Sequence, residues 1–159
     1  MTIPESSHVI RGRLEGGTGL LLLWLTAATL SVHAEESPTQ GEFVNRVYRD
    51  EQGEHKYAVF VPRDYTPEKA WPTILWLHGA SARGRDGRTQ LVAGIGPNIY
   101  QRRDTFPFLV VFPQCENLDS RLLGGWTDER EDADRALKIF QAVEQDYRVD
   151  PQRRILAGV

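Results

Sequence analysis

Residues 71–80 read WPTILWLHGA and decide the fold. The five residues 73–77 are an apolar run without polar alternation, which is typical of a strand buried on both faces in the middle of a parallel sheet. A histidine and a glycine follow the run directly. Residues 108–112, FLVVF, form a second run of this kind, and a third begins at residues 154–157, RILA. The sequence therefore predicts an α/β domain built on a mostly parallel sheet.

Two stretches before this run predict an antiparallel hairpin. Residues 43–48 and 57–61 are rich in β-branched and aromatic side chains, and residues 50–53, DEQG, have the composition of a turn. Since His55 falls in this connection, we expect its side chain to be solvated. Pro62 ends the second strand because it offers no N–H to the ladder.

Helices are predicted between the apolar runs. Residues 97–103 form a short and weak one. A longer one begins near Ala133, where acidic side chains crowd the start and interact favourably with the helix dipole. Its apolar residues recur at the spacing of one helical stripe: Ala133, Ala136, Leu137, Phe140, Val143 and Tyr147. Right-handed crossovers would place both helices on the faces of the sheet.

The composition is that of a globular domain. The chain has 159 residues, of which 40% are hydrophobic and 26% charged, so one domain of ordinary size accounts for it. A net charge of −3 argues against a nucleic-acid partner, because proteins that bind nucleic acid usually carry a basic excess on one face. Cys115 is the single cysteine, which excludes an intrachain disulfide and a cysteine-cluster metal site within this sequence.

The first 34 residues have the pattern of a secretory signal peptide that is removed after Ala34. Residues 20–25, LLLLWL, begin an apolar stretch of about a dozen residues, too short for the roughly 20 that a membrane-spanning helix needs. Two arginines precede the stretch, and residues 32–34, VHA, resemble a cleavage site. An uncleaved N-terminal anchor stays open as the alternative. We therefore predict a secreted or periplasmic domain of residues 35–159, with no stable membrane span after cleavage.

Two loops that come after predicted parallel strands carry the chemistry. The first, residues 78–87, HGASARGRDG, contains glycines whose backbone N–H groups can point at an anion or a developing oxyanion. It lacks the spacing of a phosphate loop or a dinucleotide loop, and on its own it could equally be a flexible surface turn. In the second, a strand runs into Gly158 and Val159. A Gly-x-Ser-x-Gly turn presents a serine nucleophile after such a strand, and here the serine would be the next residue.

Taken together, these segments resemble a secreted α/β-hydrolase. The resemblance rests on residues 57–65, 71–80, 106–115 and 147–151, in this order and spacing. The subgroup that it resembles is that of the phospholipase/carboxylesterase-like "predicted peptidase" esterases, which are related to dienelactone hydrolases and to feruloyl esterases of the polyhydroxybutyrate-depolymerase type. The resemblance implies the N-terminal half of that fold, in which an antiparallel hairpin precedes parallel strands with crossover helices. Residues 35–159 are thus expected to be an incomplete α/β-hydrolase domain.

The resemblance further implies a serine carboxylic ester hydrolase that uses no cofactor and no metal. The backbone N–H of Ala80, with Gly79 beside it, would form one side of an oxyanion hole. Gly158 and Val159 would begin the nucleophile elbow, and the catalytic Ser, Asp and His would all come after Val159. The chain is therefore expected to be a fragment, poorly stable and inactive by itself. Its expected partner is a small-molecule ester, and no signal for an oligomeric state is visible.

Other residues of the loops have supporting roles under this interpretation. His78 is expected to brace the loop by hydrogen bonding rather than to act as a general base, and Asp86 to hold the loop through backbone amides. Ser81 has no evident histidine partner and is disfavoured as a nucleophile. Trp126 is expected either to wall the acyl pocket or to pack at the helix start. For Cys115 we expect a packed thiol.

Two other functions stay open. A peptidase of the same fold would use the same residues on amides, so that substrate assays alone separate it from an esterase. A non-catalytic secreted binding module would use residues 78–87 to hold an anionic or a sugar ligand. The binding module would lack the catalytic residues that both enzymes are expected to have after Val159. A Ser-x-Gly there, with a later Asp and His, would indicate a hydrolase.

Overall fold

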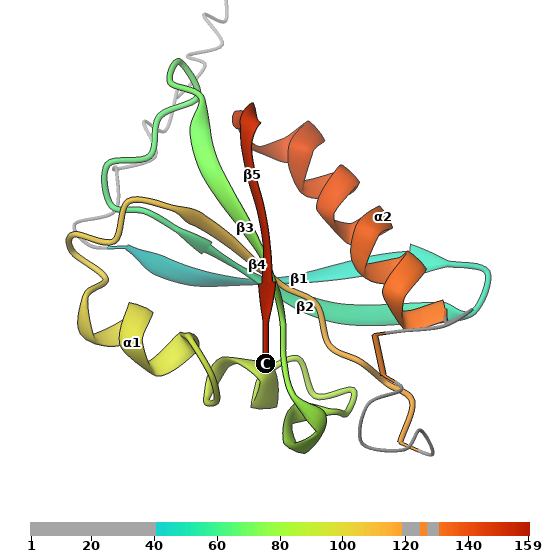
Figure 1. The fold of residues 1–159 in the computed structure, drawn as a ribbon. Helices are drawn as coiled ribbons and strands as arrows, with labels where there is room; N and C mark the ends of the chain where they lie inside the picture. Colours follow the sequence, from blue (N-terminus) through green and yellow to red (C-terminus); the bar gives the residue numbers. More distant parts are fainter. Residues whose placement is uncertain (1–40, 119–124, 127–130) are drawn as a thin grey trace, which may run out of the picture. The chain divides into compact units, whose positions relative to one another are not determined.

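The computed structural model describes residues 41–118, 125–126 and 131–159 (Figure 1), and the predicted signal peptide, residues 1–34, lies outside them. None of the helices in these residues combines the length and the apolar composition that crossing a bilayer requires. The elements in chain order are β1 (Glu42–Asp50), β2 (Gly53–Val61), β3 (Trp71–Leu77), the 3₁₀ turns η1 (Ala80–Ala82) and η2 (Thr89–Leu91), α1 (Gly96–Gln101), β4 (Leu109–Phe112), α2 (Glu131–Asp146) and β5 (Val149–Gly158).

The strands form one sheet in the order β1-β2-β4-β3-β5. β3 pairs in parallel with β4 and with β5, whereas β2 pairs antiparallel with β1 and with β4. The expectation of a mostly parallel sheet is therefore wrong for the described strands, because the hairpin joins the sheet through β2 and adds two antiparallel pairs. The predicted succession of an antiparallel hairpin, parallel strands and crossover helices is confirmed (Figure 1).

The hairpin is longer and its turn tighter than the sequence indicates. β1 and β2 pair as far as Asp50 and Gly53, so that only Glu51 and Gln52 form the turn. Gly53 has a φ of 129°, a backbone conformation that favours glycine. His55 consequently lies within β2 and is 4% exposed, so the expectation of a solvated side chain is wrong. Carboxylates on two sides hold its ring inside the protein.

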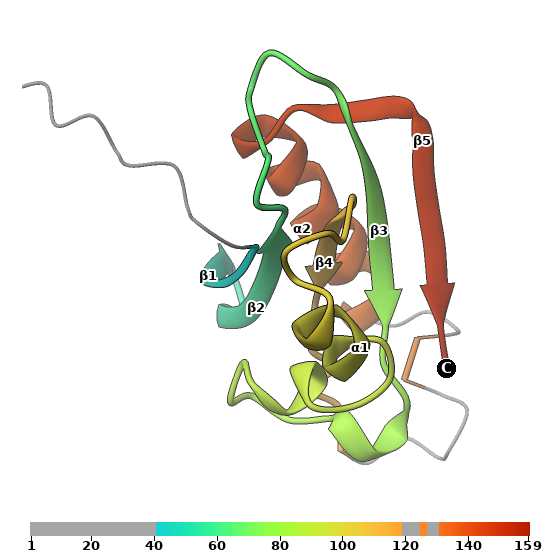
Figure 2. The same cartoon turned by 90° about the vertical axis from the view of Figure 1, so that its left-hand side faces the viewer.

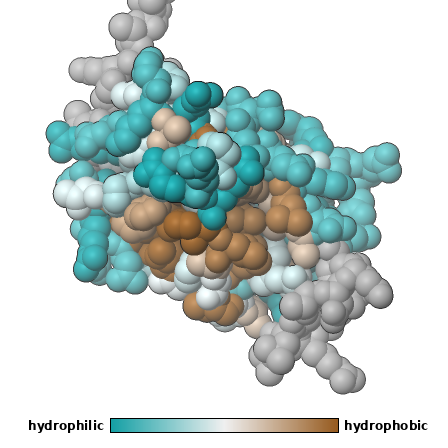
Figure 3. All heavy atoms as spheres, turned by 45° about the horizontal axis from the view of Figure 1, so that its top comes forward, coloured by the Kyte–Doolittle hydropathy of each residue, from teal (hydrophilic) through white to brown (hydrophobic). Residues whose placement is uncertain are grey.

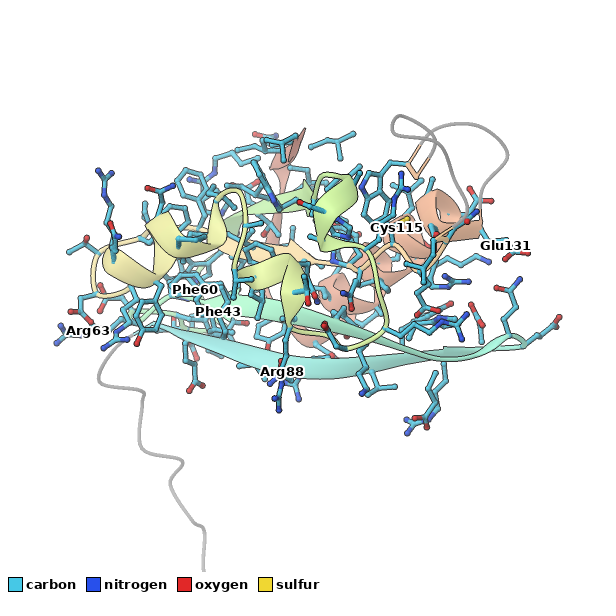
Figure 4. The ribbon with its side chains drawn as sticks, turned by 90° about the horizontal axis from the view of Figure 1, so that it is seen from below. Phe43, Phe60, Arg63, Arg88, Cys115 and Glu131 are labelled. Carbon is cyan, nitrogen blue, oxygen red and sulfur yellow. The ribbon has the colours of Figure 1, made fainter. Side chains whose placement is uncertain are left out.

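Two hydrophobic cores lie on the two faces of the sheet. Successive side chains of a strand point to opposite faces, so Val59 belongs to one core and Phe60 to the other. α2 contributes Ile139 to the first core, whereas α1 contributes Ile99 to the second. Figure 4 shows Phe60 beside Phe43 of β1, with 5.1 Å between the ring centroids. The two crossover helices therefore cover different faces of the sheet.

The face that α2 turns to the sheet overlaps the predicted stripe but is shifted around the helix: Ala136 and Val143 are buried, and Phe140 and Tyr147 pack against the first core, as predicted. Leu137, which belongs to the predicted stripe, is 55% exposed, and Ile139, which does not, is buried. The buried stripe is shifted toward the side of two polar side chains that bond inward: Asp132 accepts from the backbone of Glu116, and Arg135 donates to Gln52. The buried positions are Asp132, Arg135, Ala136, Ile139 and Val143.

β5 lies at one edge of the sheet. Its side chains Ile155 and Leu156 are 41% and 67% exposed, and Val159 directly after it is 75% exposed. Figure 3 shows hydrophobic side chains gathered in the middle of the face that it displays. The last part of this edge strand, from Ile155 on, offers backbone groups and apolar area to another segment.

The shift of the buried stripe of α2 is tested by two alanine substitutions on this helix. We expect Ile139→Ala to lower the free energy of unfolding by about 2–5 kcal/mol, because it removes a buried side chain from the core. Leu137→Ala should change it by about 0.5 kcal/mol or less, because that side chain is exposed. Urea denaturation followed by circular dichroism measures both. Equal losses would mean that Leu137 packs against the sheet, as the sequence predicts.

Candidate functional site

The two loops singled out in the sequence meet at the carboxyl edge of the sheet. β3 and β5 run in parallel with Leu77 opposite Gly158, and the N–H of Val159 donates to Leu77 O at 3.1 Å. A Cβ on Gly79 would lie 3.5 Å from Val159 O, which is van der Waals contact. A Cβ on Gly158 would lie 2.6 Å from Leu77 O, so this close approach requires glycine. Figure 2 shows β3 and β5 side by side, with the C-terminus next to the loop that leaves β3.

His78 is buried directly after β3, and both of its ring nitrogens are engaged. Its Nδ1 lies 2.8 Å from Gly79 O, and the backbone N–H of Cys115 donates to its Nε2 at 3.0 Å. A carbonyl accepts and an amide donates, so the ring is neutral with its proton on Nδ1. Burial lowers the pKa of His78. The imidazole thus ties the loop after β3 to the loop after β4, with no nitrogen left over for a substrate.

Trp126 packs against His78. Its indole N–H donates to His78 O at 2.7 Å, and its ring meets the imidazole edge-on, with 5.0 Å between the centroids. The side chain is half-buried. These two contacts with His78 therefore hold the indole at the carboxyl end of β3.

Gln114 is a residue of this site that the sequence interpretation missed. Its side chain is buried after β4, and its amide N–H₂ donates to Ala82 O at 3.1 Å and to Asp86 Oδ1 at 3.1 Å. Its carbonyl Oε1 accepts from the N–H of Gly87 at 2.8 Å. One amide thus holds the loop after β3 at three points. One feature of the sequence does indicate it: Gln114 directly follows Pro113, which ends a predicted buried strand.

Asp86 closes the far end of the same loop. Its carboxylate accepts from the N–H of Arg88 at 2.7 Å, from the N–H of Thr89 at 2.9 Å and from the Thr89 hydroxyl. These hydrogen bonds, that of the Thr89 hydroxyl foremost, hold the pKa of Asp86 well below its usual range. The carboxylate therefore organises the loop and stays ionised.

Ala80 and Ser81 begin the 3₁₀ turn η1. The N–H of Ala82 donates to Gly79 O, but no described residue accepts from the N–H of Ala80. The Ser81 side chain is exposed, and among the described residues neither histidine contacts it: His78 bonds to backbone, and His55 to carboxylates. Within the described residues, an unengaged amide thus stands at Ala80, and Ser81 lacks the neighbouring base that a nucleophile requires.

Cys115 is fully buried beside these residues, near the start of α2, where Figure 4 labels it and Glu131. Its thiol donates to Asp132 Oδ2 at 3.2 Å. Burial first, and then this hydrogen bond, raises the pKa of Cys115 to about 11, so that the thiol stays protonated. The described residues contain no group of three His, Cys, Asp or Glu side chains that could hold a metal ion.

The sequence matches no protein-family model, and no curated protein matches it. Solved structures do match. A thermostable esterase is 27% identical with a TM-score of 0.59, and the match covers 74% of this chain and 34% of that one. A ferulic acid esterase is 20% identical with a TM-score of 0.54, covering 76% and 51%. The fluorophosphonate-binding serine hydrolase FphF of Staphylococcus aureus is 16% identical with a TM-score of 0.50, covering 74% and 47%.

These structural neighbours are esterases and serine hydrolases, and this chain spans about a third to a half of their length. The described residues therefore form part of an α/β-hydrolase-like fold, which confirms the fold that the resemblance implied.

The role of Gln114 is tested by removing its amide. In Gln114→Ala we expect the backbone amides of residues 84–89 to exchange with deuterium about tenfold faster or more, because the loop loses three buried hydrogen bonds. Gln101→Ala is the matched control, since Gln101 is exposed at the end of α1. Hydrogen exchange read by mass spectrometry measures both. Unchanged exchange in this segment would show that Gln114 does not hold the loop.

Proposed function

We propose that this chain forms the oxyanion side of a serine carboxylic ester hydrolase site. In this proposal the backbone N–H of Ala80, beside Gly79, donates to the oxygen that becomes negative when an ester carbonyl is attacked. Gly158 and Val159 are the first two residues of the nucleophile elbow. The serine is the following residue, whose own neighbour contributes the second donor, and the catalytic Asp and His come later in the chain.

A single observation carries the proposal: Val159 lies against Gly79, at the end of the parallel pair β3 and β5. A residue that continues from Val159 begins its path beside Gly79, the neighbour of Ala80, whose amide no described residue engages. An oxyanion hole needs donors about 2.7–3.1 Å from the developing charge, so the nucleophile and the donor must share one end of the sheet. The register of these two strands supports the proposal, because it brings Val159 and Gly79 to the same end of the sheet.

The other residues of the site support this arrangement. A neutral His78 and the amide of Gln114 keep the loop in place without taking part in proton transfer. Trp126, fixed over His78, provides an aromatic surface beside the loop and forms a wall of the acyl pocket. The substrate is a small-molecule ester, and no cofactor enters the reaction.

The proposal predicts that this 159-residue chain does not react with a serine-directed fluorophosphonate probe, because its nucleophile lies after Val159. Gel fluorescence after incubation with the probe measures the reaction. Labelling of the unmodified chain that disappears in Ser81→Ala would place the nucleophile at Ser81 and contradict the proposal.

The donor itself is tested in a complete enzyme. Residues 78–87 are grafted onto the aligned positions of the thermostable esterase, and Ala80 is replaced by lactic acid, which removes the N–H and keeps the methyl group. We expect kcat for a nitrophenyl ester to fall about 10²–10³-fold with little change in KM, because the lost donor acts on the transition state. Ser81→Ala in the same graft is the control and should keep its activity. Equal kcat with and without the Ala80 amide would remove Ala80 from the oxyanion hole.

We also propose that residues 1–34 direct secretion or export to the periplasm and are removed after Ala34. The mature protein should begin at Glu35, as read by N-terminal sequencing of the exported protein. Ala34→Pro should leave the precursor uncleaved, because a small residue is needed before the cleaved bond. Export with residues 1–34 still attached in the unmodified protein would favour the N-terminal anchor instead.

A further inference from the structure

A second cluster of polar side chains is centred on His55, and the site described above does not include it. The Nε2 of His55 lies 2.9 Å from Asp50 Oδ1, and its Nδ1 lies 2.8 Å from Glu116 Oε1. The side chains of His55 and Glu116 are only 5% and 6% exposed. Asp50 ends β1, whereas Glu116 belongs to the loop after β4. The imidazole therefore joins the hairpin to that loop.

Both ring nitrogens of His55 face groups that accept. A carboxylate has no proton to donate, and a neutral imidazole has only one N–H. The ring satisfies both carboxylates when it is an imidazolium. Desolvation raises the pKa of Asp50, but hydrogen bonds from the Gln52 N–H and from His55 outweigh it, so that this pKa lies below its usual value. The geometry thus fits an ionised Asp50 against a charged ring.

Among the described residues that bond to one another in this cluster, the charges balance only when the ring is protonated. Arg85 Nε lies 2.9 Å from Glu116 Oε2, and Arg135 lies 2.7 Å from Asp132 and 3.6 Å from Asp50. Three carboxylates thus face two guanidinium groups, and the imidazolium supplies the third positive charge. The titratable groups around the ring in the described residues are Tyr48 and Asp50 on β1, Arg85 after β3, Glu116 after β4, and Glu131, Asp132 and Arg135 on α2.

The loop that His55 holds is the one that fixes the candidate site. Glu116 is preceded by Cys115, whose N–H donates to His78 and whose carbonyl accepts from the N–H of Gly84. Gln114, one residue earlier, holds the loop after β3. A displacement of Glu116 therefore also moves the backbone of Cys115, the preceding residue, whose N–H is bonded to His78.

We infer that His55 is a positioning residue, which as an imidazolium between Asp50 and Glu116 holds the loop after β4 against His78. When the ring loses its second proton, one nitrogen becomes an acceptor that faces a carboxylate, and one of the two bonds is lost. The link from the hairpin to the loop then opens as the pH rises through the titration of the ring. Only the effect that opening this link would have on ester hydrolysis rests on the proposed function.

The first test is a pH titration of the unmodified full-length chain, with ¹⁵N-labelled histidine followed by NMR between about pH 5 and 8. We expect both nitrogens of His55 to carry protons at the acidic end, and the Nε2 signal of His78 to shift as His55 titrates, although His78 itself stays neutral. A stability role alone would not move the His78 signal. A His55 ring with a single N–H at the acidic end, or a His78 signal that ignores the titration of His55, would overturn the inference.

The second test removes one carboxylate charge without changing its shape. In Glu116→Gln we expect the Cys115 amide to exchange with deuterium about tenfold faster or more, because a charge-assisted bond to the ring is lost. Glu54→Gln is the matched control, since Glu54 bonds to Arg49 in the same hairpin and is 61% exposed. Equal exchange in the two variants would contradict the inference.

The outcome does not depend on Glu116→Gln being folded, because the titration of the unmodified chain decides the question without it. Neither readout uses hydrolysis. Loss of the oxyanion function in the grafted esterase would therefore leave the His55 result intact, and a failed His55 titration would leave the oxyanion proposal intact.

Discussion

The register of β3 against β5 decides which loops can meet at the carboxyl edge of the sheet. The ladder continues to the last residue, because the N–H of Val159 still donates to Leu77 O. Gly158 makes this possible, since any Cβ there would lie 2.6 Å from the same carbonyl oxygen. A shift by one residue would turn each side chain to the other face and separate Val159 from Gly79. The candidate site is thus a consequence of one parallel strand pair.

A second constraint acts directly after β4, where three successive residues each bond to a different part of the structure. Gln114 holds the loop after β3, the Cys115 backbone N–H holds His78, and Glu116 reaches the ring of His55. Burying so many polar groups is costly unless each finds its partner, and a cluster of this kind favours one arrangement over its alternatives. Residues 114–116 are therefore held by specific bonds as well as by apolar packing.

The strands and the site loops could be predicted from the sequence because their signals are local. Apolar runs identify β3 and β4, and glycines mark the loops after parallel strands. The strand boundaries are harder to predict. β5, for example, begins at Val149 and includes Pro151, a residue that an edge strand can accommodate. The environments of His55, Gln114 and Leu137 depend on partners that are distant in the sequence. The burial of His55, for example, depends on Glu116, and no pattern within the hairpin indicates it.

The two histidines in the described residues serve one loop through opposite protonation states. His55 spans two carboxylates and needs both ring protons, whereas His78 spans a carbonyl and an amide and must remain neutral. Because burial lowers the pKa of His78, the unfolded chain takes up a proton there before the folded one does, and the stability that His78 contributes is lost as the pH falls below about 6.5. Acid thus weakens the link that His78 makes between the loops after β3 and β4.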